Sequence, residues 1–568
     1  MKKTFLLLLC FAAAYLIPLG SRPLVTPDEF RYAQIPYEML ESGNFAAPQM
    51  FAQPYFEKPV LGYWLTAVNF YLFGYNNFAI RLSSALATGL TALLVGFMIF
   101  STFRDKRFAA LGSLVYLGCA MVYGLGVFAV LDAPLTLFST GALLCAFAYL
   151  QEERSKLSKV FLLILCGVFC GLGFMVKGVP ALVAPGLATM GYLIWQKKWK
   201  EFVIMPYLPV IFMVLTVLPW AWCVHRADGD FWRYFIEVEH IERFTDGGVG
   251  QHKEPWYFLL PFFVGGTFPA GLLLVSGIGN LKNIIKQMYP QTLYRFAFCS
   301  AVLPLILFSC SGGKLPTYIL PCFPGIAVLI SGFVVTALRN YERSEKNLNI
   351  LFNCCGWFFG VAGILAVPAG YVLKFYFAEN PRLEAMAPGI LAIGASCAAG
   401  GMLLLLSEKK NIRQRMFFFL LQFLLPVLFV PFFIQPQIKP NKMPVSELKE
   451  MKEQFSMASP DVHIVTGPSF MHAAAWVFKT TDIQTLNSPG EMDYADMRAE
   501  KEKRRRVKIS TKDFIRYLRK KDRKDVIYIY RTGRCFKGCP GTVYEYRGVT
   551  LSARYYPGKK KAAQGAGK

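Results

Sequence analysis

The sequence predicts a polytopic α-helical membrane protein that ends in a small α/β domain. The chain of 568 residues is 54% hydrophobic and 15% aromatic, with a mean hydropathy of +0.38. Its apolar residues come in long uncharged runs, whereas the alternating pattern of a transmembrane barrel is absent. Basic clusters separate many of these runs, and after about residue 435 the composition changes to that of a soluble domain.

The first span is predicted near residues 4–20. Met1, Lys2 and Lys3 precede an apolar run that continues to Gly20, a pattern that resembles a signal sequence. The run has no persuasive cleavage site and further apolar runs follow it. We therefore interpret it as an uncleaved first helix with a cytoplasmic N-terminus.

About thirteen spans are predicted, at roughly 20 residues for each crossing. They fall near residues 4–20, 82–100, 108–127, 133–150, 160–176, 179–196, 203–223, 257–277, 293–310, 317–338, 350–373, 387–406 and 415–434.

The basic clusters predict the orientation of these spans. Every second connection carries several lysines or arginines, with the same parity as the N-terminus, so the positive-inside rule makes these connections cytoplasmic. The outer loops are then residues 21–81 and 224–256. The clusters are Arg104/Lys106/Arg107, Arg154/Lys156/Lys159, Lys197/Lys198/Lys200, Lys282/Lys286, Arg339/Arg343/Lys346 and Lys409/Lys410/Arg413/Arg415.

The segment from Val60 to Gly74 is apolar but short. If it crossed the membrane, the cluster at Arg104 would lie outside and the parity would break. We therefore expect an interfacial helix, or one that enters the membrane only part way, with Tyr63 and Trp64 at the interface.

The polar stretch from residue 26 to 59 is predicted to begin with a helix. Thr26 can cap the first amides, Pro27 suits the first helical position, and Glu29 completes a capping box. Pro36 is expected to bend or end this helix.

Asp28 has two interpretations. A helix places Arg31 and Tyr32 one turn after Asp28, on the same face, as a site would need. Acids in a first turn also stabilise a helix through its dipole by about 0.3–1 kcal/mol each, and spacing alone favours that explanation for Asp28 and Glu29.

Further charged residues lie at the outer ends of spans: Asp132, Lys177 and Lys314. Charges in such positions face a cavity or each other. An acid at a helix start can also be a cap, and a lysine at a span end can extend to the interface.

A transporter or flippase would place charges deep within its spans, which are largely uncharged here, so that alternative ranks low. An enzyme at the outer face is favoured; because nucleotide-activated substrates are scarce there, it needs a lipid-carried donor and no nucleotide cofactor.

Residues 435–568 predict a small α/β domain on the outer side. VHIVTG and DVIYIYR are typical of strands and SELKEMKEQF of a helix. The basic run KEKRRRVK is a solvated face or a contact with anionic lipid, and the tail KKKAAQGAGK is expected to be disordered. Cys535 and Cys539 could form a small disulfide loop in an extracytoplasmic domain. The net charge of +25 is attributed to the basic residues that set the membrane orientation and to contacts with anionic lipid. It does not indicate nucleic-acid binding, for which no motif is present.

Six motifs carry a resemblance to a known family. TPDEFRYAQIPYEML, YFEKPVLGYWLTA, LDAPLTLF, VKGVPALV, VEHIERF and GGKLPTYILP occur in this order. They resemble the bacterial aminoarabinose transferases of lipid A, in the protein O-mannosyltransferase-like group of GT-C membrane glycosyltransferases. The resemblance covers roughly residues 1–434.

The resemblance implies a GT-C catalytic domain over residues 1–434, with interfacial helices in the first outer loop, and a periplasmic C-terminal domain over 435–568. It implies transfer of 4-amino-4-deoxy-L-arabinose from undecaprenyl phosphate to a lipid A phosphate at the periplasmic face of the inner membrane. This would give resistance to polymyxin and other cationic peptides. The expected partners are the lipid-linked sugar, lipid A and membrane lipids, and a monomer is expected.

Residues that match the family's motifs acquire expected roles from the resemblance. Asp28 corresponds to the essential acid of the first loop, and Asp132 is expected to join it in catalysis. The carrier phosphate is expected at Tyr55, Lys58, Arg243 and Tyr318. Glu29, Lys177 and Lys314 are further polar site positions.

Two alternatives concern ion pairs and metal. Lys58 and Arg243 could instead pair with Glu57 and Glu242. Glu57 and His240 lie where the family's metal, thought to be zinc, has been proposed, but a lone histidine beside a carboxylate is more often simply hydrogen-bonded, and no multi-ligand spacing supports zinc.

The expected chemistry follows from the leaving group, which is a lipid phosphate. Lys58 and Arg243 would stabilise its developing charge. Asp28 would orient groups or stabilise positive charge on the sugar if the acceptor is an ionised phosphate, and would act as a general base if it is a hydroxyl. In-line attack inverts the anomeric centre. The alternative function is transfer of another polyprenyl-phosphate sugar, mannose or hexosamine, to lipid A, another glycan or a protein.

Overall fold

The computed structural model describes most of the chain. It covers residues 11–152, 154–242, 254–376, 381–427, 429, 443–456, 462–502, 506–520, 522–536, 539–541 and 544–558. Its internal contacts divide the chain into two compact units, each composed of three segments. The helical unit is Met1–Arg22, Glu57–Leu65 and Arg81–Gln437, and the mixed unit is Pro23–Phe56, Thr66–Ile80 and Ile438–Lys568.

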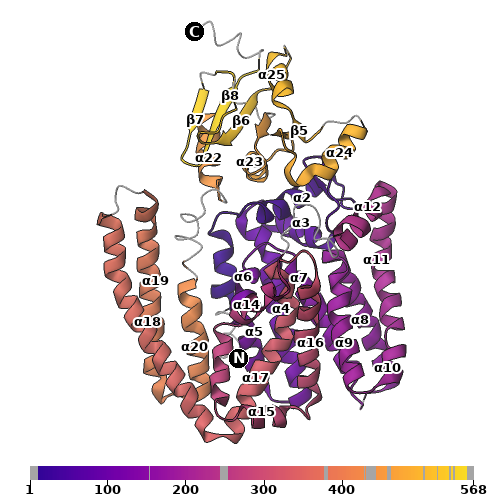
Figure 1. Cartoon of the computed structure of the whole chain (residues 1–568), viewed down its shortest axis with the longest axis vertical. Coiled ribbons are helices and arrows are strands. Elements are labelled where there is room, and N and C mark those ends of the chain that lie inside the picture. The colour runs from indigo at the N-terminus through magenta and orange to yellow at the C-terminus, as the bar shows by residue number, and fades with distance from the viewer. Residues whose placement is uncertain are drawn as a thin grey trace. The chain divides into compact units, whose positions relative to one another are not determined.

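The helical unit is a bundle of long helices with short connections (Figure 1). Its earlier elements are η1 (Ala12–Leu16), η2 (Ile17–Gly20), α4 (Asn77–Phe103), α5 (Lys106–Leu117), α6 (Ala120–Gly126), α7 (Asp132–Tyr149), α8 (Lys156–Lys177), α9 (Pro180–Trp195), α10 (Trp199–Ile204), α11 (Tyr207–Ala227), α12 (Asp230–Arg233) and η3 (Tyr234–Glu242). Its later elements are η4 (Trp256–Phe258), α14 (Leu259–Gly266), η5 (Ala270–Gly277), α15 (Leu281–Met288), α16 (Thr292–Cys310), η6 (Pro316–Cys322), α17 (Phe323–Asn340), α18 (Glu342–Tyr376), α19 (Pro381–Leu406), η7 (Ser407–Lys409) and α20 (Ile412–Val427).

The chain is a multi-pass membrane protein, as its apolar runs predict. Within the described ranges, seven helical stretches are long and apolar enough to cross a membrane: Asn77–Phe103, Lys156–Lys177, Trp199–Ala227, Thr292–Cys310, Pro316–Asn340, Glu342–Tyr376 and Glu384–Lys409. The other predicted spans correspond to shorter or interrupted helices, or extend beyond the described residues. The helical fold is therefore confirmed, whereas the number thirteen is not.

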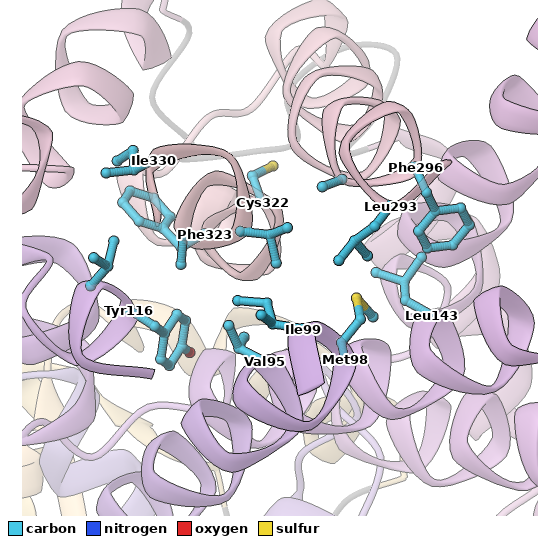
Figure 2. Packing of buried hydrophobic residues seen from close by; sticks show 14 of the residues in the cluster. Val95, Met98, Ile99, Tyr116, Leu143, Leu293, Phe296, Cys322, Phe323 and Ile330 are labelled. Atoms are coloured by element: carbon cyan, nitrogen blue, oxygen red, sulfur yellow. The ribbon is translucent and has the colours of Figure 1, made fainter. Parts of the chain in front are cut away.

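A large apolar core holds the helical unit together. Figure 2 shows side chains from five helices and from η6 meeting in it. The labelled residues are all at most 6% exposed: Val95, Met98 and Ile99 of α4, Tyr116 of α5, Leu143 of α7, Leu293 and Phe296 of α16, Cys322 of η6, and Phe323 and Ile330 of α17. Fully burying a large apolar side chain contributes about 1.5–3 kcal/mol, so this core supplies much of the unit's packing energy.

Two of the predicted spans are interrupted. The run at 108–127 forms α5 and α6, and the run at 257–277 forms α14 and η5. The two interruptions meet, because Cys119 and Pro269 form an isolated antiparallel bridge and the Ala120 amide donates to the Phe268 carbonyl at 2.7 Å. The main-chain groups released by the breaks therefore bond to each other rather than remaining unsatisfied in an apolar environment.

Two of the basic connections are in contact with each other. The Arg339 guanidinium after α17 pairs with Asp105 before α5, with 3.0 Å between the nearest nitrogen and oxygen. Asp105 also caps α5, and the Phe108 amide is the main contact that lowers the pKa of its carboxyl. Two connections that the parity argument assigned to the same side are therefore in direct contact.

The mixed unit combines the first outer segment with the C-terminal region. The first segment holds α2 (Asp28–Ser42) and a hairpin of β1 (Gln49–Met50) and β2 (Gln53–Pro54), while α3 (Leu61–Phe73) has residues in both units. The C-terminal region contains α22 (Val445–Gln454), β3 (His463–Thr466), α23 (Met471–Phe478), β4 (Ile483–Leu486), η10 (Gly490–Met492), α24 (Asp493–Lys501), β5 (Lys508–Ile509), α25 (Thr511–Arg519), β6 (Val526–Arg531), β7 (Tyr544–Arg547) and β8 (Leu551–Tyr556).

Six of these strands form one sheet in the order β5-β4-β3-β6-β8-β7. The neighbours from β5 to β6 are parallel, with Ile464 opposite Ile483 and Ile527, while β8 runs antiparallel to both β6 and β7. The predicted strands and the predicted first helix of this region are confirmed as β3, β6 and α22. The sequence did not indicate that residues 23–56 belong to the same compact unit.

Helix α2 begins differently from its prediction. It starts at Asp28, with Pro27 at the N-cap and no side-chain cap, while the Thr26 hydroxyl is buried with no hydrogen-bond partner among the described residues. Glu29 reaches back to the Val25 amide at 3.0 Å instead of to Thr26. Pro36 does not end the helix, which continues to Ser42 and stops at Gly43, where φ is +68°.

Candidate active site

Three predicted site residues come together in the helical unit. Lys177 Nζ lies 2.6 Å from Asp132 Oδ1 and 4.9 Å from the centre of the Tyr318 ring. The side chains of Lys177 and Asp132 are only 11% and 6% exposed, so the pair is largely removed from solvent. The sequence predicted these residues separately, and the structure makes them one cluster.

The helix ends position this cluster. Asp132 is the first residue of α7 and Lys177 the last of α8, and these consecutive helices are neighbours that run in opposite directions. Their opposite ends therefore meet, and a carboxylate at an N-terminus and an ammonium at a C-terminus are each favoured by the helix dipole. Tyr318 comes from η6, where its ring packs at 6.1 Å from Phe308 of α16.

Lys58 belongs to a second ion pair. Its Nζ donates to Glu239 Oε2 at 2.7 Å and to the main-chain carbonyl of Glu57 at 2.8 Å. The side chains of Lys58 and Glu239 are 13% and 8% exposed. The sequence offered the neighbouring acids Glu57 and Glu242 as partners and missed Glu239, although it stands immediately before His240 in the motif VEHIERF.

Packing contacts link the elements that carry the two ion pairs. Gly62, four residues after Lys58, lies against Leu131, which precedes Asp132, so that a Cβ at Gly62 would clash with the Leu131 side chain. The Phe235 ring of η3, the helix that carries Glu239, lies 6.0 Å from the Phe174 ring near the end of α8. Both lysine–carboxylate pairs are therefore at one end of the bundle.

Lys314 has a structural environment. It is 6% exposed, and its Nζ donates to the carbonyl of Glu254 at 2.8 Å and to that of Ser311 at 2.6 Å. These bonds tie the chain before η4 to the turn after α16. These hydrogen bonds give Lys314 a structural role, holding two loops together, rather than the role of a substrate ligand.

Asp28, Glu29 and Tyr55 lie in the mixed unit. The Asp28 side chain is 53% exposed at the first position of α2, 3.7 Å from Arg31, which confirms that Arg31 shares its face. Glu29 is fully buried and bonds to the main chain at Val25. Tyr55 is 4% exposed, and its amide donates to the Pro48 carbonyl at 2.9 Å. Asp28 is thus accessible, whereas Glu29 supports the helix start.

The remaining predicted residues concern phosphate and metal. Arg243 and the side chain of His240 lie outside the described residues. In the part of the chain that the structure describes, no three His, Cys, Asp or Glu side chains are grouped as a metal site would need. Zinc takes three or four protein ligands, so Glu57 and the described residues around it do not form a zinc site.

The pair Cys535 and Cys539 is present as two free thiols rather than as a disulfide. Both are partly buried beside the apolar cluster of Phe514, Tyr528 and Tyr556. Burial, together with a hydrogen bond that the Cys535 thiol donates to Cys539, raises the pKa of Cys535 to about 12. A thiol with so high a pKa is protonated near neutral pH and is a weak nucleophile.

The chain resembles several characterised proteins. Residues 1–235 match the family described as dolichyl-phosphate-mannose-protein mannosyltransferase. An undecaprenyl phosphate-alpha-4-amino-4-deoxy-L-arabinose arabinosyl transferase from Enterobacter sp. (strain 638) is 41% identical over 328 residues, which are 58% of this chain and 58% of that relative. The enzyme of the same name from Erwinia tasmaniensis is 34% identical over 500 residues, 86% of each chain.

A solved structure has the same fold. ArnT from Cupriavidus metallidurans, crystallised with undecaprenyl phosphate, superposes with a TM-score of 0.79, covering 98% of each chain at 20% identity. The expected GT-C-type helical fold with a small C-terminal α/β region is thereby confirmed.

Proposed function

The chain belongs to the undecaprenyl phosphate-alpha-4-amino-4-deoxy-L-arabinose arabinosyl transferases, and on this premise we propose that it transfers 4-amino-4-deoxy-L-arabinose from undecaprenyl phosphate to a phosphate of lipid A. The reaction takes place at the periplasmic face of the bacterial inner membrane. Transfer replaces part of the negative charge of lipid A and gives resistance to polymyxin and other cationic peptides.

One observation carries the proposal. Two largely buried lysines, Lys58 and Lys177, lie at one end of the helical unit, each within 2.7 Å of a carboxylate oxygen. A phosphate that enters this region meets cations already fixed in place by Glu239 and Asp132. Fixed cations in a water-poor site stabilise a developing anion without the cost of reorganisation.

The chemistry of the leaving group determines which residues act on the phosphate. When the bond between the sugar and the lipid phosphate breaks, charge grows on the phosphate oxygen, and Lys58, with Arg243 from the family motif, stabilises it. The family's motifs also assign Tyr55 and Tyr318 as phosphate ligands. Lys177 is held by Asp132 against the Tyr318 ring, so this cluster fixes the position of Tyr318.

Asp28 acts on the sugar side of the reaction. A lipid A phosphate is largely ionised near neutral pH and needs no base, so Asp28 orients the acceptor or stabilises the positive charge that grows at the anomeric carbon. Its exposed position at the start of α2 leaves the carboxylate accessible to substrate. In-line attack from the face opposite the leaving phosphate inverts the anomeric centre.

The first experiment is mass spectrometry of lipid A from cells with and without the protein, under conditions in which the donor is made. We expect a protein-dependent mass increase of one aminoarabinose, lost in Asp28→Ala. Asp493→Ala is the matched control, because Asp493 is also an exposed acid at the first position of a helix, α24. That control loses at most the helix-dipole contribution of about 0.3–1 kcal/mol and keeps the modification.

Other outcomes contradict parts of the proposal. A mass increase of a hexose or hexosamine would assign a different donor to the same fold. Unchanged lipid A in cells that make both protein and donor would refute lipid A as the acceptor. Modification that survives Asp28→Ala would reduce Asp28 to a helix-start acid.

A further inference from the structure

The hairpin that precedes Tyr55 has an unfavourable turn. Strands β1 and β2 pair Gln49 with Pro54 and Met50 with Gln53, which leaves Phe51 and Ala52 as a two-residue loop. Both have positive φ, +56° and +57°. Two positive φ values are typical of a type I′ turn, in which Asn-Gly is strongly preferred because other residues meet their own Cβ. Phe-Ala therefore needs support from outside the turn.

Glu38 supplies that support. Its Oε1 accepts the Phe51 amide at 2.7 Å and its Oε2 accepts the Ala52 amide at 2.9 Å, so one carboxylate binds both central amides of the turn. Gln34, one helical turn earlier on α2, donates its side-chain nitrogen to Oε1 at 2.7 Å. The Glu38 side chain is buried, with the residue only 4% exposed. A buried acid with three N–H donors is a built contact rather than an accidental one.

The ionisation of Glu38 fits this arrangement. Burial raises the pKa of its carboxyl, while the hydrogen bonds from Ala52, Gln34 and Phe51 act in the opposite direction. All three contacts are N–H donors, and such contacts favour the ionised carboxylate of Glu38.

The turn fixes the place of Tyr55. The Tyr55 amide donates to the Pro48 carbonyl at 2.9 Å, which closes the hairpin directly after β2. On the other side, the buried Phe51 ring lies 5.4 Å from the ring of His472 in α23. A change of one residue in the hairpin register would turn Tyr55 to the opposite face.

We propose that Glu38 is a positioning residue: by holding the Phe51–Ala52 turn, its carboxylate sets the register that presents Tyr55 to the carrier phosphate. This inference rests on the proposed function for the identity of the ligand. It assigns Glu38 no contact with substrate, so its effect passes entirely through the turn.

The decisive test is a rescue experiment on the full-length purified protein. Glu38→Gln keeps the size of the side chain but presents an NH₂ group to one amide, so the turn loosens. Ala52→Gly removes the Cβ that conflicts with positive φ, so the turn needs the acid less. Glu41→Gln is the matched control, since Glu41 is an exposed acid on the same helix.

The first readout is hydrogen exchange of a peptide that covers residues 48–56. Glu38→Gln should accelerate exchange at Phe51 and Ala52 by about tenfold or more, the effect of losing a hydrogen bond to a charged group. Adding Ala52→Gly should restore most of the protection, and Glu41→Gln should leave it unchanged. Unchanged exchange in Glu38→Gln overturns the inference, whatever the enzyme's activity.

The second readout is the Kd for undecaprenyl phosphate alone and the KM for the sugar donor. Both should rise about tenfold in Glu38→Gln, with a smaller change in kcat, and both should recover in the Ala52→Gly double variant. Recovery of exchange protection without recovery of Kd overturns the inference. A wild-type protein that does not bind undecaprenyl phosphate refutes the proposed function instead, while the exchange experiment still judges the turn.

Discussion

At the scale of single residues, the site consists of cations that already have counter-ions. Lys58 is paired with Glu239 and Lys177 with Asp132, so each buried positive charge is neutralised without substrate. Removing one partner of a buried pair costs about 3–5 kcal/mol, whereas exchanging one anionic partner for another costs far less. A phosphate that binds Lys58 therefore competes with the Glu239 carboxylate.

This competition gives a prediction for Glu239→Gln. Without the carboxylate, the phosphate of undecaprenyl phosphate becomes the main counter-ion of Lys58, so we expect its Kd to fall about threefold to tenfold. Lys58→Ala should raise the Kd instead. Isothermal titration calorimetry in detergent measures both changes.

The control for this prediction is Glu237→Gln on the same helix. Glu237 is 58% exposed and pairs with Arg233, so its loss should leave the Kd unchanged. Weaker binding in Glu239→Gln would show that Glu239 orients Lys58 rather than competing for it.

The sequence proposed the charged site residues but did not indicate how they pair. Asp132 and Lys177 could be selected because acids and lysines at the ends of apolar runs are unusual. Their contact depends on two helices running side by side, and the partner of Lys58 comes from residue 239, far away in the sequence. Local pattern could not choose Glu239 over Glu57 or Glu242, because only the fold brings η3 to Lys58.

At the scale of elements, the interrupted spans are the main departure from prediction. A continuous apolar run indicates one crossing helix, and in the run 108–127 only Gly118, the C-cap of α5, stands at the break before Cys119. The break is stabilised by tertiary contact, since Ala120 donates to Phe268 across the bridge. By contrast, α8, α16 and α17 form near their predicted positions because their apolar runs continue for about 17 residues or more.

Two adjacent glycines of α14 test how tightly this region is packed. A Cβ at Gly266 would lie 2.7 Å from Phe323 Cζ and 2.9 Å from Met121 Cβ, whereas a Cβ at Gly265 meets nothing within 4 Å. Gly266→Ala should destabilise the protein by about 1–3 kcal/mol through overpacking. Gly265→Ala should be neutral or slightly stabilising because alanine favours a helix.

Thermal unfolding of both variants in detergent measures this difference. Equal midpoints for Gly266→Ala and Gly265→Ala would mean that α14 shifts freely, and the close packing of α6, α14 and α17 would be contradicted.

At the scale of the whole molecule, the C-terminal region is joined to the first outer segment. The Tyr37 hydroxyl donates to the Lys479 carbonyl at 3.3 Å, and Phe70 lies 6.0 Å from Trp476. The change of composition near residue 435 indicated a separate domain, and its strands could be read from their β-branched and aromatic residues. Its association with residues 23–56 could not be predicted from the sequence, because contacts between distant segments produce no pattern in the local sequence.

Deleting residues 438–568 should therefore damage the beginning of the chain. Helix α2 buries Phe30, Ile35 and Met39, and exposing each such side chain costs about 1.5–3 kcal/mol. We expect the truncated protein to insert into membranes but to be cleaved rapidly within residues 23–56 by limited proteolysis, and to lose transfer activity.

Removing only residues 559–568, which the sequence predicts to be a disordered tail, is the control and should leave both properties intact. Normal protection of α2 in the longer deletion would contradict its dependence on the C-terminal region.

The composition of the mixed unit from three separate segments also has a consequence for biosynthesis. Its first two segments end at Ile80, and the third begins at Ile438, so about 360 residues must be translated between them, which takes roughly 20 to 70 s at 5–20 residues per second. During that interval α2 and its hairpin lack the C-terminal segment of their unit. The nascent protein therefore leaves the apolar side chains of α2 open to proteolysis until the ribosome has nearly finished the chain.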